Sequence, residues 1–299
     1  MIVDLVQTTT CDGVRLDGML QVPPAGRATQ LPADAFLFIH GTGGSFYSST
    51  LFDSFGERLL DRGSAVLRVN TRGHDGISTA ATARGGQRLG AAYELVDDCR
   101  YDLAAWTDWL GTRGFSRIGL VGHSLGAVKS MYWLAVEPHA AVVCLVALSP
   151  PRLSYSHFAA SDRGPEFLAA CAVAEQHVRA GQPLALMEVT LPLPFVIAAG
   201  GYLEKYGPDE RYNFLKFASR LPVPTLFTYG SVELETNMAF RGVPELLAPI
   251  VAAHGRMQVE VIAGADHFYS GVRAEAVSRV EAWLRGESWL TAPVRSRGG

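Results

Sequence analysis

Short apolar runs alternate with longer amphipathic segments along most of the chain. Most of the short runs are almost continuously apolar, which is typical of strands covered on both faces. The longer segments repeat apolar residues at helix spacing, as Val272, Ala276, Val280 and Trp283 do. The expected strands are residues 35–39, 65–69, 117–121, 141–148, 225–229 and 257–262, and the expected helices are residues 51–62, 95–110, 125–136, 243–254 and 272–285.

Two departures from this alternation complete the expected fold. Near the N-terminus, residues 3–9 and 14–22 flank an Asp-Gly turn dipeptide and predict a β-hairpin. About 70 residues, 150–222, separate two strands that elsewhere are joined by 20 to 30, and a loop of that length must carry its own structure. We therefore predict an α/β fold, a mostly parallel sheet with helices on both faces and an insertion holding helices at 166–179 and 208–220.

This pattern divides the chain into three parts. Residues 1–150 and 222–290 are expected to form the core, and residues 151–221 a helical cap over one end of the sheet. Residues 291–299, which include a proline and two terminal glycines, are expected to fray. A chain of 299 residues is long enough to bury a core that needs no covalent staples.

The composition argues against nucleic acid and membranes as partners of this protein. The 26 basic and 29 acidic residues give a net charge of −3, without a basic cluster that would bind nucleic acid. Residues 1–7 lack the positive start of a secretory signal, and the longest apolar run, residues 140–148, is shorter than the roughly 18 residues of a membrane span. We expect a cytoplasmic protein that acts on a small molecule, with neither nucleic acid nor membrane as a partner, and the sequence is compatible with a homodimer.

The four cysteines lie far apart, without a C-x-x-C pair. This spacing favours neither a zinc site nor a disulfide framework, and an H-E-x-x-H metal motif is also missing from the sequence. We therefore expect no bound metal, and cysteines that are reduced, buried and inert.

The strongest chemical signal is Gly122-His123-Ser124-Leu125-Gly126, which directly follows one expected strand and directly precedes an expected helix. The motif alone is weak, but a serine on a sharp strand-to-helix turn has its hydroxyl aimed away from the sheet edge. The N–H of Leu125, at the helix start, can then face developing negative charge. The bland alternative is a serine that caps a helix.

A second signal is His40-Gly41-Thr42-Gly43-Gly44-Ser45, which follows the strand at 35–39. Such a loop leaves backbone N–H groups free to approach a substrate oxygen, so Thr42 is our candidate for the second oxyanion donor. The alternatives are a tight turn or a phosphate loop. The phosphate version lacks its Gly-Lys-Ser/Thr ending, and no G-x-G-x-x-G is present, so we expect no cofactor.

A serine nucleophile needs a base and a carboxylate that orients the base. His267 lies just past the last expected strand and before the last helix, on the same sheet edge as Ser124, and His74 is the runner-up. Glu233 and Glu235 both follow the strand at 225–229, and Glu233 is closer to its end. The neighbouring Asp266 is expected to fix its loop.

The chain resembles the α/β-hydrolase superfamily over nearly its whole length. The order serine, acid, histidine matches the usual layout, as do HGTGG at 40–44, RGHDGIS at 72–78 and GADH at 264–267. The resemblance implies eight strands, a mobile helical cap between the sixth and seventh strands, and ester or related acyl hydrolysis without a cofactor. Many members carry aspartate where this chain has Glu233.

Within that superfamily, GHSLGAVKS at 122–130 and ALSPPRLSY at 147–155 are most similar to a group of largely uncharacterised bacterial hydrolases. A weaker similarity reaches fungal esterases that cleave siderophore esters. The predicted activity is a serine hydrolase that cleaves a carboxylic ester of a small to medium apolar or aromatic substrate. A thioesterase, a lactonase or a carbon–carbon bond hydrolase would use the same triad, and a non-catalytic ligand receptor could keep the same fold.

Aromatic residues of the cap and the oxyanion loop are candidates for the substrate pocket. They either line this pocket or simply pack the cap onto the core. Arg72 could likewise anchor a substrate carboxylate or form a structural ion pair. The candidate substrate-binding residues are Phe46, Tyr47, Phe158, Phe195 and Tyr202.

Overall fold

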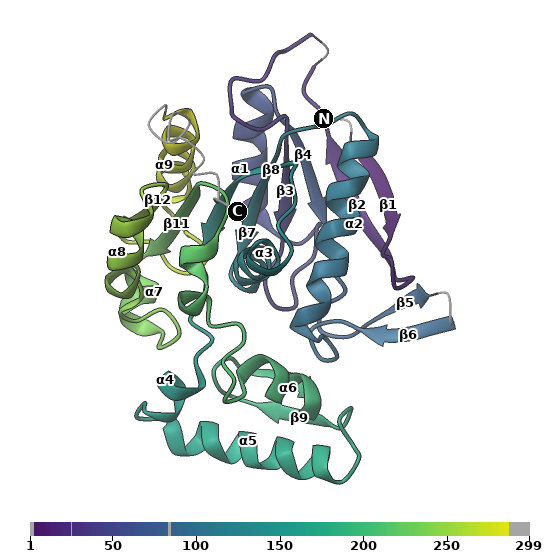
Figure 1. The fold of residues 1–299 in the computed structure, drawn as a ribbon, viewed down its shortest axis with the longest axis vertical. Helices are drawn as coiled ribbons and strands as arrows, with labels where there is room; N and C mark the ends of the chain where they lie inside the picture. The colour runs from purple at the N-terminus through teal and green to yellow at the C-terminus, as the bar shows by residue number, and fades with distance from the viewer. Residues whose placement is uncertain (1–2, 25, 83–84, 287–299) are drawn as a thin grey trace, which may run out of the picture.

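An eight-stranded sheet forms the centre of the protein, seen in a computed structural model that describes residues 3–24, 26–82 and 85–286. The strand order is β1-β2-β4-β3-β7-β8-β11-β12 (Figure 1). The N-terminal hairpin pairs antiparallel, as does β2 with β4, and all other pairs are parallel. The strands are β1 (Asp4–Thr9), β2 (Arg15–Gln21), β3 (Ala35–Ile39), β4 (Ala65–Val69), β7 (Ile118–His123), β8 (Val142–Leu148), β11 (Thr225–Gly230) and β12 (Met257–Ile262).

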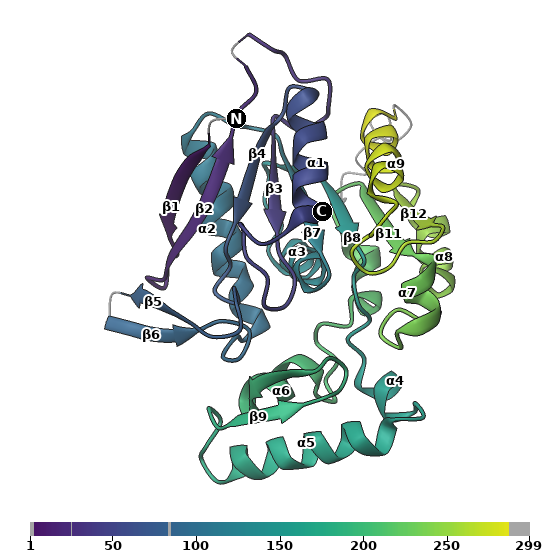
Figure 2. The ribbon, with the colours of Figure 1, turned by 180° about the vertical axis from the view of Figure 1, so that it is seen from behind.

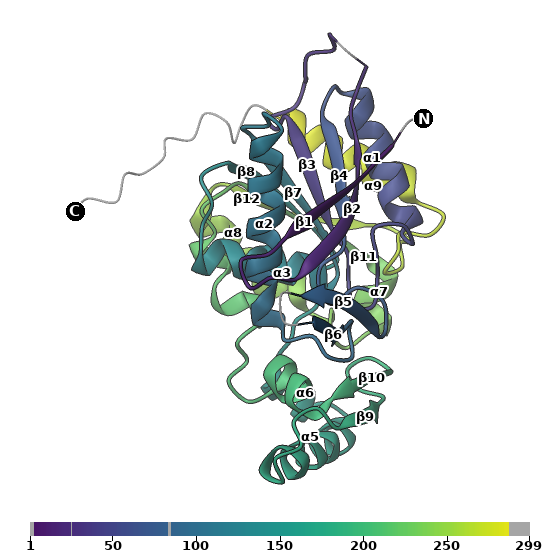
Figure 3. The same ribbon diagram turned by 90° about the vertical axis from the view of Figure 1, so that its right-hand side faces the viewer.

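Helices cover both faces of this sheet. On one face lie α1 (Thr50–Asp61) and α9 (Arg273–Arg285), and on the other lie α2 (Cys99–Thr112), α3 (Leu125–Val136) and α8 (Val243–His254) (Figure 3). A short 3₁₀ turn, Val96–Asp98, leads into α2. Because parallel strands are covered on both faces, β3 and β4 are buried at every position, as their continuous apolar runs predict.

The sequence prediction of the fold class is therefore confirmed, and the predicted bounds of β3, β4, β12, α3 and α8 agree with the structure. One element of the core was not predicted. β5 (Ser78–Thr82) and β6 (Gly85–Leu89) form a separate antiparallel pair outside the main sheet. Their residues are mostly exposed and small or polar, so they carry no hydrophobic alternation by which to recognise a strand. The predicted frayed tail, residues 291–299, lies outside the described residues.

The segment between β8 and β11 forms a layer beyond the carboxyl ends of the parallel strands, and α5 is its outermost element (Figure 2). The helix predicted at 166–179 is confirmed as α5. The segment is not purely helical, because β9 and β10 form a small hairpin. Its elements are α4 (Tyr155–Ala159), α5 (Gly164–Arg179), β9 (Leu186–Val189), β10 (Phe195–Ala198), α6 (Ala199–Tyr206) and two 3₁₀ turns, Phe214–Lys216 and Ala218–Arg220.

The helix predicted at 208–220 is wrong. Glu210 has a φ of 49°, a left-handed conformation that an α-helix does not tolerate. Its carboxylate holds it there, accepting hydrogen bonds from the Ser156 N–H at 2.7 Å and from the Asn213 side chain at 2.9 Å. Asn213 is local, but Ser156 belongs to α4, 54 residues away in the sequence, so the local pattern of 208–220 could not reveal that contact.

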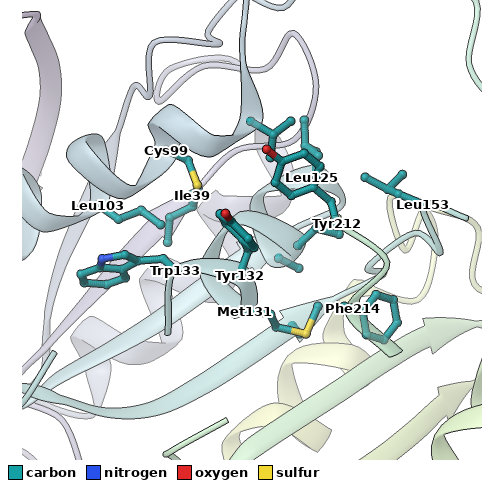
Figure 4. Close-up of a cluster of buried hydrophobic side chains, with 14 of the residues drawn as sticks. Ile39, Cys99, Leu103, Leu125, Met131, Tyr132, Trp133, Leu153, Tyr212 and Phe214 are labelled. Atoms are coloured by element: carbon teal, nitrogen blue, oxygen red, sulfur yellow. The ribbon is translucent and has the colours of Figure 1, made fainter. Parts of the chain in front are cut away.

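The cap and the core share one hydrophobic cluster around α3 (Figure 4). Tyr132 of α3 meets Tyr212 edge to face, with ring centroids 4.9 Å apart. Phe214 stacks against Phe227 of β11, with centroids 6.1 Å apart. The same helix that begins at the candidate nucleophile is therefore packed against both layers.

No helix in the described part of the chain has both the length and the apolar character needed to cross a bilayer.

Candidate active site

Ser124 sits on the tight turn between β7 and α3, with φ 56° and ψ −125°. A non-glycine residue in such a conformation costs roughly 1 to 3 kcal/mol. The turn depends on close backbone contacts at two glycines. A Cβ on Gly126 would lie 2.2 Å from the carbonyl oxygen of Ile39, and one on Gly41 would lie 2.9 Å from the Ser124 Cβ. The elbow and the loop after β3 are thus pressed together.

His267 and Glu233 meet at the same edge of the sheet. The His267 Nδ1 lies 2.7 Å from the Glu233 Oε2. Because a carboxylate oxygen can only accept, Nδ1 carries the proton and Nε2 is left free to act as a base. Glu233 is 3% exposed, whereas the side chain of His267 is 27% exposed. The imidazole therefore connects a buried carboxylate to the solvent side.

A chain of hydroxyl groups holds the other oxygen of Glu233. The Ser149 hydroxyl donates to Glu233 Oε1 at 2.6 Å, and the Gly230 N–H donates to the same oxygen at 2.7 Å. Since the Ser149 proton is used there, the Tyr269 hydroxyl donates to Ser149 at 2.9 Å, and Thr228 donates to Tyr269 at 2.6 Å. Sequence reasoning missed Ser149 and Tyr269. The only local signal was that Ser149 directly follows a strand.

The structure distinguishes between the alternative residues that the sequence offered for the acid and the base. Glu235 is exposed, and His74 pairs with the adjacent Asp75 at 2.9 Å, so neither takes part in the His267 pair. Asp266 accepts hydrogen bonds from the N–H groups of Phe268 and Ser270, both at 2.9 Å. It therefore fixes its loop, as expected.

Two further histidines of the site are buried and neutral. The Nε2 of His123 lies 2.8 Å from the carbonyl oxygen of His267 and so donates to it, which fixes the backbone that carries the candidate base. Burial and the nearby charge of His267 lower the pKa of His123 to about 3. Burial and the charge of Lys129 lower the pKa of His40 to about 4. Neither ring competes with His267 as a base.

A cavity of about 310 Å³ opens over these groups. Ser124 and His267 both line it, together with Thr42 and Leu193 of the cap. Ser124 makes no hydrogen bond to His267 or to any other described side chain through its hydroxyl, so the hydroxyl is available to a ligand in the cavity. The volume is at the lower end of the range for small-molecule sites.

The two predicted oxyanion donors lie in the loop after β3 and at the start of α3. Thr42 lines the cavity, and Leu125 is the first residue of α3, whose N–H has no carbonyl partner within the helix. Thr42 also lines a second cavity of about 530 Å³. The two cavities meet at Thr42 and Leu193, and the walls of the second are largely apolar, with Ile77, Phe195 and Val196 among them.

The five predicted substrate-binding residues lie in different environments, and only some of them line a cavity. Phe195 lines the second cavity. Phe158 and Tyr202 are 1% and 0% exposed and pack within the cap against Phe167, so they correspond to the packing alternative. Phe46 lines neither of the two cavities, and Tyr47 is exposed, with its hydroxyl bonded to Asp75. Leu193, which the sequence did not single out, lines both.

The structure also bears on the sequence expectations for Arg72 and for the four cysteines. Arg72 is buried and paired with Asp12, Asp98 and Asp102, which is the structural ion pair and not a substrate anchor. Three cysteines are buried as expected, but Cys11 is exposed in the turn of the N-terminal hairpin, and all four are free. No group of His, Cys, Asp and Glu residues within the described ranges is arranged to hold a metal ion.

Comparison with known proteins identifies the family of this chain. The model of the alpha/beta hydrolase family matches residues 36–283. The chain belongs to the α/β hydrolase family. No curated protein sequence matches it.

Solved structures share the fold of this α/β hydrolase at low sequence identity. Est1E from Butyrivibrio proteoclasticus, with ferulic acid bound, is 15% identical, with a TM-score of 0.63 over 93% of this chain and 98% of the other. An esterase from Pyrococcus furiosus is 19% identical, with a TM-score of 0.60 over 95% and 91%. The alpha/beta hydrolase GrgF from Penicillium sp. sh18 is 14% identical, with a TM-score of 0.66 over 95% and 98%.

Proposed function

We propose that this α/β hydrolase is a serine esterase that cleaves a carboxylic ester of a small to medium apolar or aromatic substrate through an acyl-enzyme. The observation that carries the proposal is the 2.7 Å pair between His267 and the buried Glu233, beside a strained Ser124 in the same cavity. A structural serine does not need a partly exposed histidine with an oriented, free Nε2.

In the proposed reaction, His267 Nε2 takes the proton of Ser124 as the hydroxyl oxygen attacks the ester carbonyl. Glu233 holds the ring in one tautomer and stabilises its charged form. The oxyanion accepts hydrogen bonds from the N–H groups of Thr42 and Leu125, each worth roughly a factor of 10² to 10³ in rate. His267 then protonates the leaving alcohol, and water cleaves the acyl-enzyme with the roles reversed.

The apolar second cavity supports the substrate class. It meets the catalytic cavity at Thr42, so a scissile carbonyl at Ser124 would have an apolar space on one side. Ile77 and Val196 are 56% and 43% exposed there, an apolar surface that a ligand would cover. Apolar walls with few polar groups are typical of small-molecule sites.

The decisive experiment is hydrolysis of p-nitrophenyl esters, from acetate to decanoate, by the wild type and by Ser124→Ala. We expect the substitution to lower kcat by roughly 10⁶-fold, to the background rate. A fluorophosphonate probe should add its mass to Ser124 in the wild type alone. The chain-length optimum then measures the acyl space.

Ser116→Ala is the matched control, because Ser116 is exposed just before β7, at the opposite end of the strand from Ser124. It should keep full activity. Equal rates of the wild type and Ser124→Ala would overturn the ester proposal, and the same pair would then be tested on thioesters, lactones and acyl ketones. Failure on all of these would favour a ligand receptor.

A further inference from the structure

The catalytic cavity contains one permanent charge among the described residues that line it. Arg273, in the first turn of α9, lines the cavity together with Ser124 and His267. Glu233 is shielded behind the imidazole ring and is not part of the wall. The other two histidines in the wall are the neutral His40 and His123. The wall therefore presents a positive charge without an opposing carboxylate.

Arg273 is oriented by the protein but is not neutralised by it. Its Nε donates to the carbonyl oxygen of Phe268, next to the candidate base, at 3.3 Å. Its two terminal nitrogens have no hydrogen bond or ion pair with any residue in the described ranges. A guanidinium anchored through Nε keeps the fork of its terminal N–H groups free, the geometry that binds a carboxylate at two points.

Two other arginines show what the chain does when an arginine is structural. Arg72 is surrounded by three aspartates. Arg279, two turns further along α9, contacts Glu275 and Glu260. Arg273 shares the helix with Arg279 but not its partners, and it differs by facing the cavity.

The rest of the wall is mixed. Ser48, Ser49 and Thr50 line the cavity, and so do the apolar Leu51 and Phe52. Across Thr42 the second cavity is largely apolar. A substrate whose scissile carbonyl lies at Ser124 thus meets a guanidinium in one cavity and a largely apolar wall in the other.

We propose that the natural substrate carries a carboxylate that pairs with Arg273 in the catalytic cavity, and an apolar group that fills the second cavity. This inference rests on the proposed esterase function and names its substrate class, an ester that bears a free acid. Arg273 determines specificity and takes no part in bond cleavage. It selects the substrate by charge, and the apolar cavity selects it by size.

The test compares pairs of esters that differ only in charge. Mono-4-nitrophenyl adipate and its methyl ester place the charge on the acyl side, and 4-carboxyphenyl butyrate and its methyl ester place it on the alcohol side. In at least one pair we expect the wild type to prefer the acid by 10-fold or more in kcat/KM, mainly through KM. The pair that responds shows which side of the ester Arg273 contacts.

Arg273→Gln should lower kcat/KM for the preferred acid by about 10- to 100-fold, the range for a hydrogen bond between charged groups. The ratio of kcat/KM for the acid to kcat/KM for the neutral ester should therefore fall by about 10-fold or more. Arg273→Lys should recover part of the loss, and added salt should weaken the preference of the wild type. Arg279→Gln, on the same helix but outside the cavity wall, should leave all rates unchanged.

A binding measurement decides the inference even without turnover. Monomethyl adipate, with its acid on the acyl side, and 4-carboxyphenyl butyrate, with its acid on the alcohol side, are each titrated calorimetrically into Ser124→Ala and into the same variant with Arg273→Gln added. Binding of either ligand that the second substitution weakens by 10-fold or more supports the carboxylate site. Absence of binding by both ligands, or equal binding by both proteins, overturns it. Hydrolysis of neutral esters without any acid preference would overturn the inference while leaving the esterase proposal intact.

Discussion

Two buried glutamates, Glu233 and Glu94, show how one residue type serves different ends in this fold. Glu233 is 3% exposed and Glu94 is 1% exposed. Glu233 faces His267, whose ring reaches the cavity. Glu94 faces Lys129 of α3 and Lys205 of α6, and the side chains of both lysines are at most 1% exposed.

The two glutamates differ because their charged or polar partners differ. Burial by itself would raise the pKa of Glu94, but the ammonium groups of Lys129 and Lys205 outweigh it and lower the pKa. Lys129 also donates to the Thr71 hydroxyl at 3.1 Å, and the Thr71 N–H donates to His40 Nε2 at 3.0 Å. Glu94 therefore links α6 of the cap, α3 and the loop after β3 in one network of buried polar groups. Glu233, unlike Glu94, has a direct partner that lines the cavity, and only such a carboxylate can influence a bound ligand.

The first way to break this comparison is Glu233→Gln. An amide can neither hold the correct imidazole tautomer nor stabilise the imidazolium, so kcat/KM for a p-nitrophenyl ester should fall roughly 10⁴-fold, about 5.5 kcal/mol. The free energy of unfolding in urea should change by far less than these roughly 5.5 kcal/mol. Glu235→Gln, two residues further and exposed, should keep full activity. A Glu233→Gln enzyme with near-normal rates would show that the 2.7 Å pair is only structural.

Glu94→Gln should show the opposite pattern. It leaves two buried ammonium groups without a counter-charge, and removal of one partner of a buried ion pair costs about 3 to 5 kcal/mol. The free energy of unfolding in urea measures this loss. Molecules that remain folded should keep kcat within 10-fold of the wild type. A variant with wild-type stability would contradict the ionic role assigned to Glu94.

The smallest effect concerns pH. The pKa values of His40 and His123 are lowered from 6.5 to about 4 and about 3, so the unfolded chain binds more protons than the folded one below pH 6.5. The stability that these two histidines contribute is therefore fully present above pH 6.5 and is lost as the pH falls. Each histidine should cost about 2 kcal/mol between pH 7.5 and 5.

Urea unfolding at the two pH values measures this loss. His123→Gln keeps an N–H donor for the His267 carbonyl but does not titrate, so it should remove one histidine's share of the pH dependence. The wild type at pH 7.5 and 5 serves as the reference. An unchanged dependence in the variant would show that His123 is not the neutral, buried group described above.

The sequence predicts the sheet and the positions of the site residues better than it predicts the structure of the cap. Strand ends in a parallel sheet share one edge, so Ser124, Glu233 and His267 could be brought together from their positions alone. The cap follows no such rule. Its helix α6 contains two glycines and forms because the buried Tyr202 and Tyr206 pack it.

The groups that sequence analysis missed depend on contacts between distant segments. Ser149 acts on a glutamate 84 residues away, and Tyr269 supports it across 120 residues. Leu193 reaches the catalytic cavity from the turn of a small cap hairpin. Arg273 sits in the first turn of an amphipathic helix, where an arginine is ordinary, and only the cavity distinguishes it from Arg279.

The tight backbone contacts at the elbow also bear on protein engineering. Any side chain at Gly41 or Gly126 would collide with neighbouring atoms, and a Cβ on Gly122 would lie 2.6 Å from the Cα of Ala127. A saturation library at these three positions should therefore return glycine and little else. Diversity for new substrates is better placed at Leu193 and Ile77, which are exposed side chains that border the cavities. The geometry of the candidate site depends on these main-chain contacts, so the walls can be varied without disturbing the turn that carries Ser124.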